Sequence, residues 1–249
     1  MNVALVAAFA APGLAVGSFL NVVAARLPLH RSLVRPPSAC MSCGVEIARR
    51  DNIPIVSYLL LHGRCRHCMA KISLRYPATE LVTALLAGAC AVRFGFTPYA
   101  LLAAGFCVVL VAVSVIDIEH RIIPNRIVLP ATAVVLVAQE IRTPSLEWPL
   151  AALAASSFLF IAAVAYPRGM GMGDVKLALL LGAMLGRTVA VAMMVGLLAA
   201  VVPSLFLFAK HGRSARGMAI PLGPFLAFGG VVALFAGPEI LDWYTGLSH

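Results

Sequence analysis

The chain has 249 residues, of which 61% are hydrophobic and only 12% are charged. A soluble globular domain carries about 25% charged residues, so this composition excludes an ordinary soluble domain, and the mean hydropathy of +0.97 agrees. The formal net charge of +9 does not indicate a nucleic-acid partner, because in a membrane protein Lys and Arg first report the side of the bilayer that a loop occupies. Long apolar stretches without alternation favour membrane helices over a β-barrel.

Eight apolar stretches predict an all-α polytopic membrane protein with about eight transmembrane helices. The first stretch has no basic residue ahead of its apolar core, and its first charge is Arg26. A secretory signal peptide has the reverse order, so we expect a retained first helix over residues 1–25. The stretches cover residues 3–25, 79–96, 98–116, 127–141, 149–166, 174–186, 188–209 and 220–241.

A polar insert, residues 26–77, separates the first two spans and holds nine of the nineteen Lys and Arg residues. The positive-inside rule places this insert in the cytoplasm and the N-terminus outside. Successive loops must then alternate between the two sides of the membrane, which fixes the side of each remaining loop. Of all the Lys and Arg residues, only Arg93, Arg142 and Arg187 fall in loops on the outer side. We therefore expect three parts: the first helix, the cytoplasmic insert, and a seven-helix membrane domain over residues 78–249.

Two carboxylates lie at the ends of apolar spans. Asp117 ends the third span, which runs inward, and Asp174 begins the sixth, which runs outward. Both are therefore expected near the cytoplasmic face. A carboxylate costs about 2.5–3.5 kcal/mol at the centre of a membrane helix and less near the interface. One interpretation is therefore that both are surface residues at span ends, with Asp174 as an N-cap residue only.

Three features favour a functional interpretation of the two acids. The span over Val175–Gly186 rises only about 18 Å, against a hydrocarbon core of about 30 Å, so Asp174 is expected below the inner surface. The glycines of GMGMG, which precede Asp174, permit close approach of another backbone. Pro124 breaks the helix soon after Asp117.

Two carboxylates within hydrogen-bonding distance share one proton, because both cannot easily ionise. The ionised member takes a proton from water, and the protonated member polarises a carbonyl. We therefore predict that Asp117 and Asp174 are the catalytic pair of a peptidase that uses neither a metal nor a covalent intermediate. The helix dipole favours an ionised Asp174 at a helix N-terminus and a protonated Asp117 at a helix C-terminus.

The insert contains two cysteine pairs, Cys40-x2-Cys43 and Cys65-x2-Cys68. Thiolates at this spacing are typical of a tetrahedral zinc site of the ribbon kind. The alternative is a pair of disulfides, which the reducing cytoplasm disfavours. Four sulfur ligands leave no open position, so the zinc is expected to be structural. The sequence thus predicts a small zinc-ribbon-like insert between the first two spans.

Six segments of the chain, in order from about residue 10 to about residue 190, resemble the type IV prepilin peptidases, which are leader peptidase/N-methyltransferases. These segments are GSFLNVVAARLP, the paired cysteines, DNIPIVSYLLLHGRCRHC, ISLRYPATELVTALL, DIEHRIIPN and GMGDVKLALLLGAMLG. Two departures from the family pattern are Asn125, where many members have Asp, and CMSC in place of the more frequent Cys-Pro-x-Cys.

The resemblance implies a membrane aspartic peptidase of the GxGD class. Such an enzyme cuts the short basic leader of a type IV prepilin or pseudopilin after a Gly, at the cytoplasmic face of the inner membrane. The family motifs assign the catalytic aspartates to Asp117 and Asp174, and the zinc ligands to Cys40, Cys43, Cys65 and Cys68. The family's second activity methylates the new N-terminal amine with S-adenosylmethionine, and its residues are not placed in this sequence. The implied partners are the prepilin or pseudopilin substrate and membrane lipid.

Two other functions are compatible with the composition. In a small transporter, Asp117 and Asp174 would relay protons or bind cations. In a membrane-anchored zinc adaptor, the insert would bind a partner and the two acids would do no chemistry.

Overall fold

The computed structural model describes residues 3–166, 170–212 and 220–246. Within these ranges, eight long helices follow the predicted spans in order, which confirms the all-α fold. They are α1 (Val3–Arg26), α3 (Arg75–Phe94), α4 (Pro98–His120), α5 (Asn125–Arg142), α6 (Glu147–Ala165), α7 (Met172–Leu185), α8 (Val189–His211) and α9 (Gly223–Thr245). The shorter elements are η1 (Arg49–Asn52), α2 (Val56–Leu60) and η2 (Gly186–Thr188).

Six stretches of the described chain are long and apolar enough to cross a membrane. One of them, Met172–Lys210, joins α7 and α8 through the turn η2, and α5 is not among the six. The chain is therefore a polytopic membrane protein, as predicted. Separate crossings by α5 and α7 stay a prediction.

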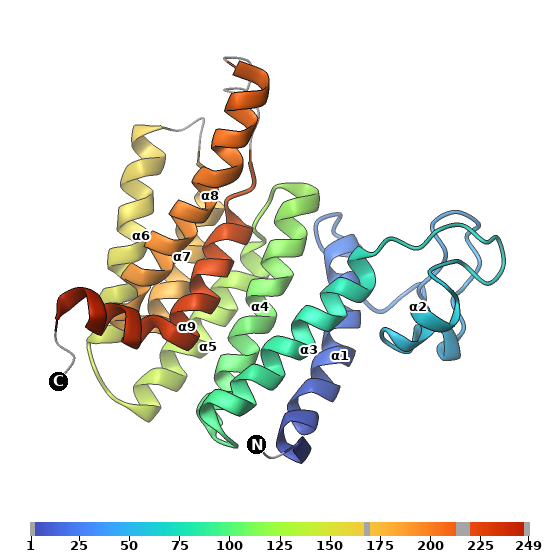
Figure 1. The fold of residues 1–249 in the computed structure, drawn as a ribbon, viewed down its shortest axis with the longest axis horizontal. Coiled ribbons are helices and arrows are strands. Elements are labelled where there is room, and N and C mark those ends of the chain that lie inside the picture. Colours follow the sequence, from blue (N-terminus) through green and yellow to red (C-terminus); the bar gives the residue numbers. More distant parts are fainter. Residues whose placement is uncertain (1–2, 167–169, 213–219, 247–249) are drawn as a thin grey trace. The chain divides into compact units, whose positions relative to one another are not determined.

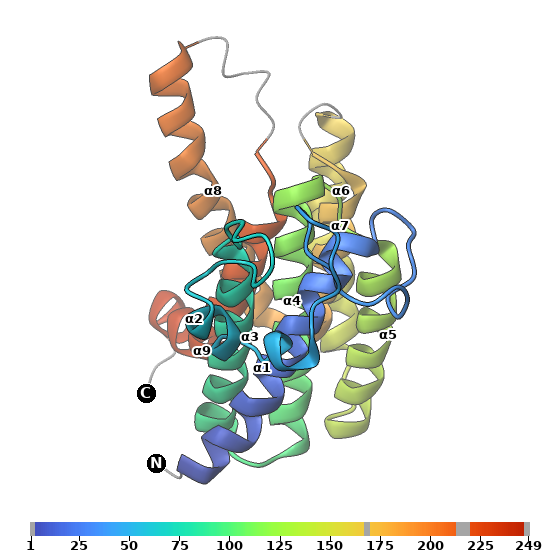
Figure 2. The ribbon, with the colours of Figure 1, turned by 90° about the vertical axis from the view of Figure 1, so that its right-hand side faces the viewer.

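The chain divides into two compact units, Met1–Ala112 and Val113–His249, so that α4 contributes to both. In the first unit, α1 and α3 pack side by side and the polar insert extends from one end of this pair (Figure 1). Figure 2 shows the same unit after a quarter turn, with the loops of the insert facing the viewer. A Cβ atom on Gly17 of α1 would lie 2.7 Å from the Cα atom of Glu80. Such close backbone contact is typical of small residues between membrane helices.

The insert contains two copies of one backbone structure, which we call the first knuckle (residues 38–47) and the second knuckle (residues 63–72). Each copy carries one Cys-x2-Cys pair and one isolated antiparallel bridge, Ala39 with Glu46 and Arg64 with Lys71. The matching hydrogen bonds are Cys40 N to Val45 O and Cys65 N to Ala70 O, both 2.9 Å, then Ile47 N to Ser38 O and Ile72 N to Gly63 O, both 2.8 Å. This paired arrangement is the zinc-ribbon-like insert that the cysteine spacing predicts.

Two buried polar residues connect the first unit internally. Glu80 of α3, which is 7% exposed, accepts a 2.7 Å hydrogen bond from the backbone N–H of Ile55, the residue ahead of α2. Asn21 of α1 donates from Nδ2 to the carbonyl oxygen of Tyr76 in α3 at 3.2 Å. A carboxylate of a membrane helix thus holds the chain of the insert in place, and an amide holds the helix pair together.

In the second unit, α7 is the central helix and contacts α5, α6, α8 and α9. Nearly every residue from Asp174 to Leu185 is buried, and beyond Lys176 the helix contains only apolar residues, as is typical of a helix in the centre of a bundle. Its C-terminal end is held by Gln139 of α5, which is fully buried and donates from Nε2 to the carbonyl oxygen of Met184 at 2.8 Å. The burial of α7 fixes the position of Asp174 at its N-terminal end.

Candidate functional site

Asp117 lies in the last turn of α4 and is 6% exposed. The helix ends soon afterwards because Arg121 adopts a left-handed φ of +54°. The Oδ2 atom of Asp117 accepts a 2.9 Å hydrogen bond from the backbone N–H of Gly223, the first residue of α9. A Cβ atom on Gly223 would lie 2.8 Å from that oxygen, so the contact between backbone and carboxylate requires glycine at this position.

Asp174 is the third residue of α7 and is 9% exposed. Its Oδ2 atom accepts a hydrogen bond from the N–H of Gly171 at 3.2 Å, while its own N–H donates to the Gly171 carbonyl oxygen at 3.1 Å. This reciprocal pair caps the helix. The interpretation of Asp174 as a surface N-cap residue is wrong, because Gly171 occupies the N-cap position and Asp174 is buried in the first turn of the helix.

The segment that follows Asp117 packs against the residues around Asp174. A Cβ atom on Gly173 would lie 2.8 Å from the Cβ atom of Ile123, so the glycine permits the approach that its position in GMGMG suggests. Lys176 donates from Nζ to Oδ1 of Asn125 at 2.9 Å. Gly169, the first residue of GMGMG, lies outside the described part of the chain.

These contacts bring the two acids together in the second unit. Asp117 lies near the C-terminal end of α4 and Asp174 near the N-terminal end of α7, and the segment after Asp117 contacts Gly173 beside Asp174. Both are buried, and each is oriented by a backbone N–H at the start of a helix. Their catalytic roles stay a prediction.

Sequence reasoning missed Gly223. The start of α9 carries the positive end of a helix dipole, and it faces Asp117 through the N–H of Gly223. Asp117 lies at the C-terminal end of α4 but also faces the N-terminal end of α9, so the dipole argument does not distinguish the ionised member from the protonated one. The sequence feature that could have indicated a role for Gly223 is its position between Pro221 and Pro224 at the beginning of an apolar span.

The four cysteines of the insert form a separate cluster in the first unit. All four are free thiols whose sulfur atoms lie within 4.8 Å of one another, and the Sγ atoms of Cys40 and Cys68 are 3.7 Å apart. A zinc–sulfur bond of about 2.3 Å implies sulfur–sulfur distances of about 3.8 Å in a tetrahedron, whereas a disulfide needs about 2.05 Å. The donor set therefore fits zinc.

Backbone N–H groups donate hydrogen bonds to one of these thiols. Hydrogen bonds from the N–H groups of Cys43 and Ser42 lower the pKa of Cys40 from 9.0 to about 6. A lowered pKa favours the thiolate, which is the form of cysteine that binds a metal ion.

The fold and these sites define a polytopic membrane protein with a buried carboxylate pair and a four-thiol cluster in a polar insert. Residues 12–94 match the family model of the Bacterial Peptidase A24 N-terminal domain, and residues 104–209 match that of the Type IV leader peptidase family. The first match contains all four cysteines, and the second contains Asp117 and Asp174. The chain belongs to the Type IV leader peptidase family, as the sequence motifs predict.

Similar proteins span nearly the whole chain. A Bacillus subtilis protein named prepilin leader peptidase/N-methyltransferase is 36% identical over 242 residues, which cover 95% of this chain and 96% of the relative. A Pseudomonas aeruginosa protein of the same name is 38% identical over 271 residues, with 93% and 90% covered. One from Neisseria gonorrhoeae is 32% identical over 276 residues, with 95% and 93% covered. No solved structure gives a significant match.

Proposed function

We propose that this chain is an inner-membrane prepilin peptidase that also N-methylates the new N-terminus of its product. It removes the leader of a type IV prepilin or pseudopilin. The observation that carries the peptidase assignment is the pair of buried carboxylates, Asp117 and Asp174, in the segment that matches the peptidase family. Neither the fold nor the relatives support the transporter alternative.

The proposed reaction uses one oxygen of each carboxylate for orientation and the other for chemistry. The N–H groups of Gly223 and Gly171 hold the two Oδ2 atoms. The ionised acid takes a proton from water, and the water oxygen attacks the peptide carbonyl carbon. The protonated acid donates a hydrogen bond to the carbonyl oxygen and later supplies the proton of the leaving amine as the C–N bond breaks.

Cleavage of a prepilin substrate by the purified full chain in lipid nanodiscs tests this assignment. Asp117→Asn and Asp174→Asn are each expected to lower kcat by about 100- to 10,000-fold, the contribution of general acid–base catalysis. Asp242→Asn, an equivalent change at the end of α9, is expected to cleave at the normal rate. A single variant at Asp117 or Asp174 that keeps the normal rate would exclude the carboxylate pair.

The insert has a separate proposed role. Cys40, Cys43, Cys65 and Cys68 hold one structural zinc ion that stabilises the two knuckles, because four thiolates leave no open coordination position.

S-adenosylmethionine, when bound, supplies the methyl group: the neutral amine forms the N–C bond while the C–S bond breaks and its electron pair stays on sulfur. The proposed division places the first helix in residues 1–25, the zinc domain in 26–77 and the peptidase in 78–249.

The proposed orientation follows from the basic residues. The insert and the carboxylate pair lie on the cytoplasmic side and the N-terminus lies outside, because Lys and Arg are concentrated in loops on the cytoplasmic side of membrane proteins. A short basic leader would then be held near the anionic inner leaflet. The apolar part of the substrate would remain in lipid beside the enzyme.

A further inference from the structure

The short helix α2 of the insert turns apolar side chains outward and a polar one inward. Ser57 is buried, and its hydroxyl accepts a 3.0 Å hydrogen bond from the N–H of Ile53. The exposed side chains occupy positions i, i+3 and i+4, which lie on one side of a helix. We call this side the α2 face, and its members are Val56, Leu59 and Leu60 at 48%, 66% and 72% exposure. A helix whose outer side faces water has the reverse arrangement, so the α2 face indicates an apolar neighbour.

A buried carboxylate holds the start of α2 at the level of a membrane span. The Oε2 atom of Glu80 accepts a 2.7 Å hydrogen bond from the N–H of Ile55, the residue ahead of α2. Glu80 lies five residues beyond Arg75, the first residue of α3, which is about 7.5 Å along the helix. The next two residues, Leu81 and Val82, are exposed and belong to a stretch that is long and apolar enough to cross a membrane. The helix α2 therefore begins at a level that lipid can reach.

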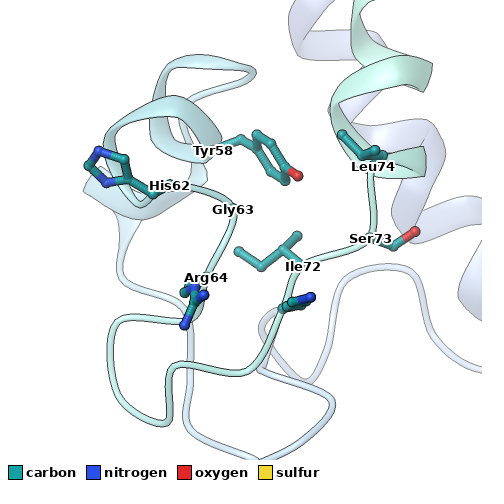
Figure 3. Close-up of a pocket in the computed structure, with 8 residues that line it drawn as sticks. Tyr58, His62, Gly63, Arg64, Ile72, Ser73 and Leu74 are labelled. Atoms are coloured by element: carbon teal, nitrogen blue, oxygen red, sulfur yellow. The ribbon is translucent and has the colours of Figure 1, made fainter.

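A cavity of about 490 Å³ opens between α2, the second knuckle and the start of α3. Figure 3 shows Tyr58 and Ile72 pointing toward the space between them. The lining contains two exposed cations, Arg64 and Lys71, and no acidic side chain. Leu74, which immediately precedes α3, is also part of the lining and is exposed. The cavity therefore fits an anionic group that has an apolar group beside it.

The two cations are not needed for the fold of the second knuckle. Arg64 pairs with Lys71 across the antiparallel bridge, whereas the first knuckle has Ala39 and Glu46 at the same positions of the repeat. The hydrogen-bonded backbone is the same in both. Like charges directly opposite one another in an antiparallel pair are destabilising. Two cations at such a position therefore indicate an anionic ligand that offsets their repulsion.

The charge of the whole insert favours a lipid surface as the neighbour. Residues 26–77 contain nine Lys and Arg residues against two acidic ones, Glu46 and Asp51. Asp51 is already paired with Arg66 through two hydrogen bonds of 2.6 and 2.8 Å. Each Lys or Arg near an anionic leaflet contributes about 1 kcal/mol to membrane binding. An exposed apolar helix face with basic residues around it is typical of elements that lie in the membrane interface.

We propose that the insert docks on the inner leaflet of the membrane. The α2 face enters the acyl chains, and Arg64 and Lys71 bind the headgroup phosphate of an anionic phospholipid in the cavity. The leaflet is the inner one in the orientation proposed above. The insert is then held against the membrane by its own lipid contacts, in addition to its chain connections to α1 and α3.

Photo-crosslinking of the full chain in nanodiscs of phosphatidylglycerol and phosphatidylcholine tests the α2 face. The photoreactive residue p-benzoyl-phenylalanine in place of Leu60 is expected to give an adduct with the added mass of one phospholipid. The matched control carries the same residue in place of Glu46, an exposed acid of the first knuckle, whose charge is not stable in lipid. This control is expected to lose the adduct. No lipid adduct at position 60, or a crosslink to a second copy of the chain instead, would overturn the docking.

The headgroup of the captured lipid tests the cavity. With p-benzoyl-phenylalanine in place of Leu74, the adduct is expected to contain more phosphatidylglycerol than its share of the nanodisc lipid. Arg64→Met/Lys71→Met is expected to abolish this excess. Arg31→Met/Arg35→Met should keep it, because these are exposed cations of the same insert outside the cavity lining.

The outcomes of the second experiment are equally decisive. No excess of phosphatidylglycerol in the unmutated cavity, or an excess that survives the loss of both cations, would overturn the headgroup assignment. An unchanged temperature of thermal unfolding would show that each variant is folded. Neither experiment uses cleavage or methylation as its readout, so a failure of the docking is distinguishable from a failure of the proposed function.

Discussion

Replacing Gly223 with Ala tests how the carboxylate of Asp117 is oriented. The new Cβ atom would lie 2.8 Å from Oδ2 and 3.3 Å from Cγ of Asp117. A carbon atom is not tolerated that close to the oxygen, so the carboxylate has to turn away. The turn breaks the 2.9 Å hydrogen bond from the Gly223 N–H. The backbone itself tolerates Ala, because Gly223 is not among the residues with positive φ.

The expected effect follows from the strength of the lost contact. A hydrogen bond to a charged group contributes about 1.5–3 kcal/mol. If Asp117 must keep its orientation in the transition state, kcat falls by about 10- to 150-fold, since each 1.36 kcal/mol corresponds to a factor of ten. KM is expected to change little, because Gly223 orients the carboxylate and does not recognise the leader.

Steady-state cleavage of a prepilin substrate, with thermal unfolding measured in parallel, checks this expectation. Gly105→Ala in α4 is the matched control, because no heavy atom lies within 4 Å of the added Cβ atom there. It is expected to cleave at the normal rate. A Gly223→Ala enzyme with the kcat of the Gly105→Ala control would refute the proposed orientation of Asp117.

Two further predictions concern the insert and the orientation of the chain. Cys65→Ser is expected to reduce bound zinc from one ion per chain to nearly none by elemental analysis, because a structural site needs all four ligands. Cys107→Ala, a buried cysteine of α4, should keep its zinc, and a Cys65→Ser chain with full zinc would exclude the four-thiol site. Alkaline phosphatase fused after Ser42 is expected to be inactive and after Ser145 active, since the enzyme folds only outside the reducing cytoplasm; the opposite pattern would reverse the proposed orientation.

The helices could be predicted from the sequence because long apolar stretches mark membrane spans directly. The start of α3 shows the limit of this signal. The apolar stretch begins at residue 79, but the helix begins at Arg75 and runs through polar residues and Pro77, which is tolerated in a first turn. Hydropathy marks the residues that are stable in the hydrocarbon core of the membrane, and a helix can extend beyond that core.

The candidate site was predictable only in part. Asp117 and Asp174 stand out because a carboxylate is costly within an apolar span. The contact of Asp117 with Gly223 joins residues 106 positions apart, and neither hydropathy nor charge marks it. The repeat of the two knuckles was equally hidden, because the shared hydrogen bonds belong to the backbone while the side chains match only at the two cysteines and at Ile47 and Ile72.

The way in which the two acids are held bears on their chemistry. Among the described residues, both carboxylates take their hydrogen bonds from backbone N–H groups, and the nearby Lys176 donates to Asn125 instead. A full positive charge bonded to each carboxylate would favour two anions, which could not share a proton. Neutral N–H donors fix the direction of one oxygen while leaving the protonation of the pair adjustable. Orientation of both carboxylates by backbone N–H groups is therefore the arrangement that an acid–base pair of two aspartates requires.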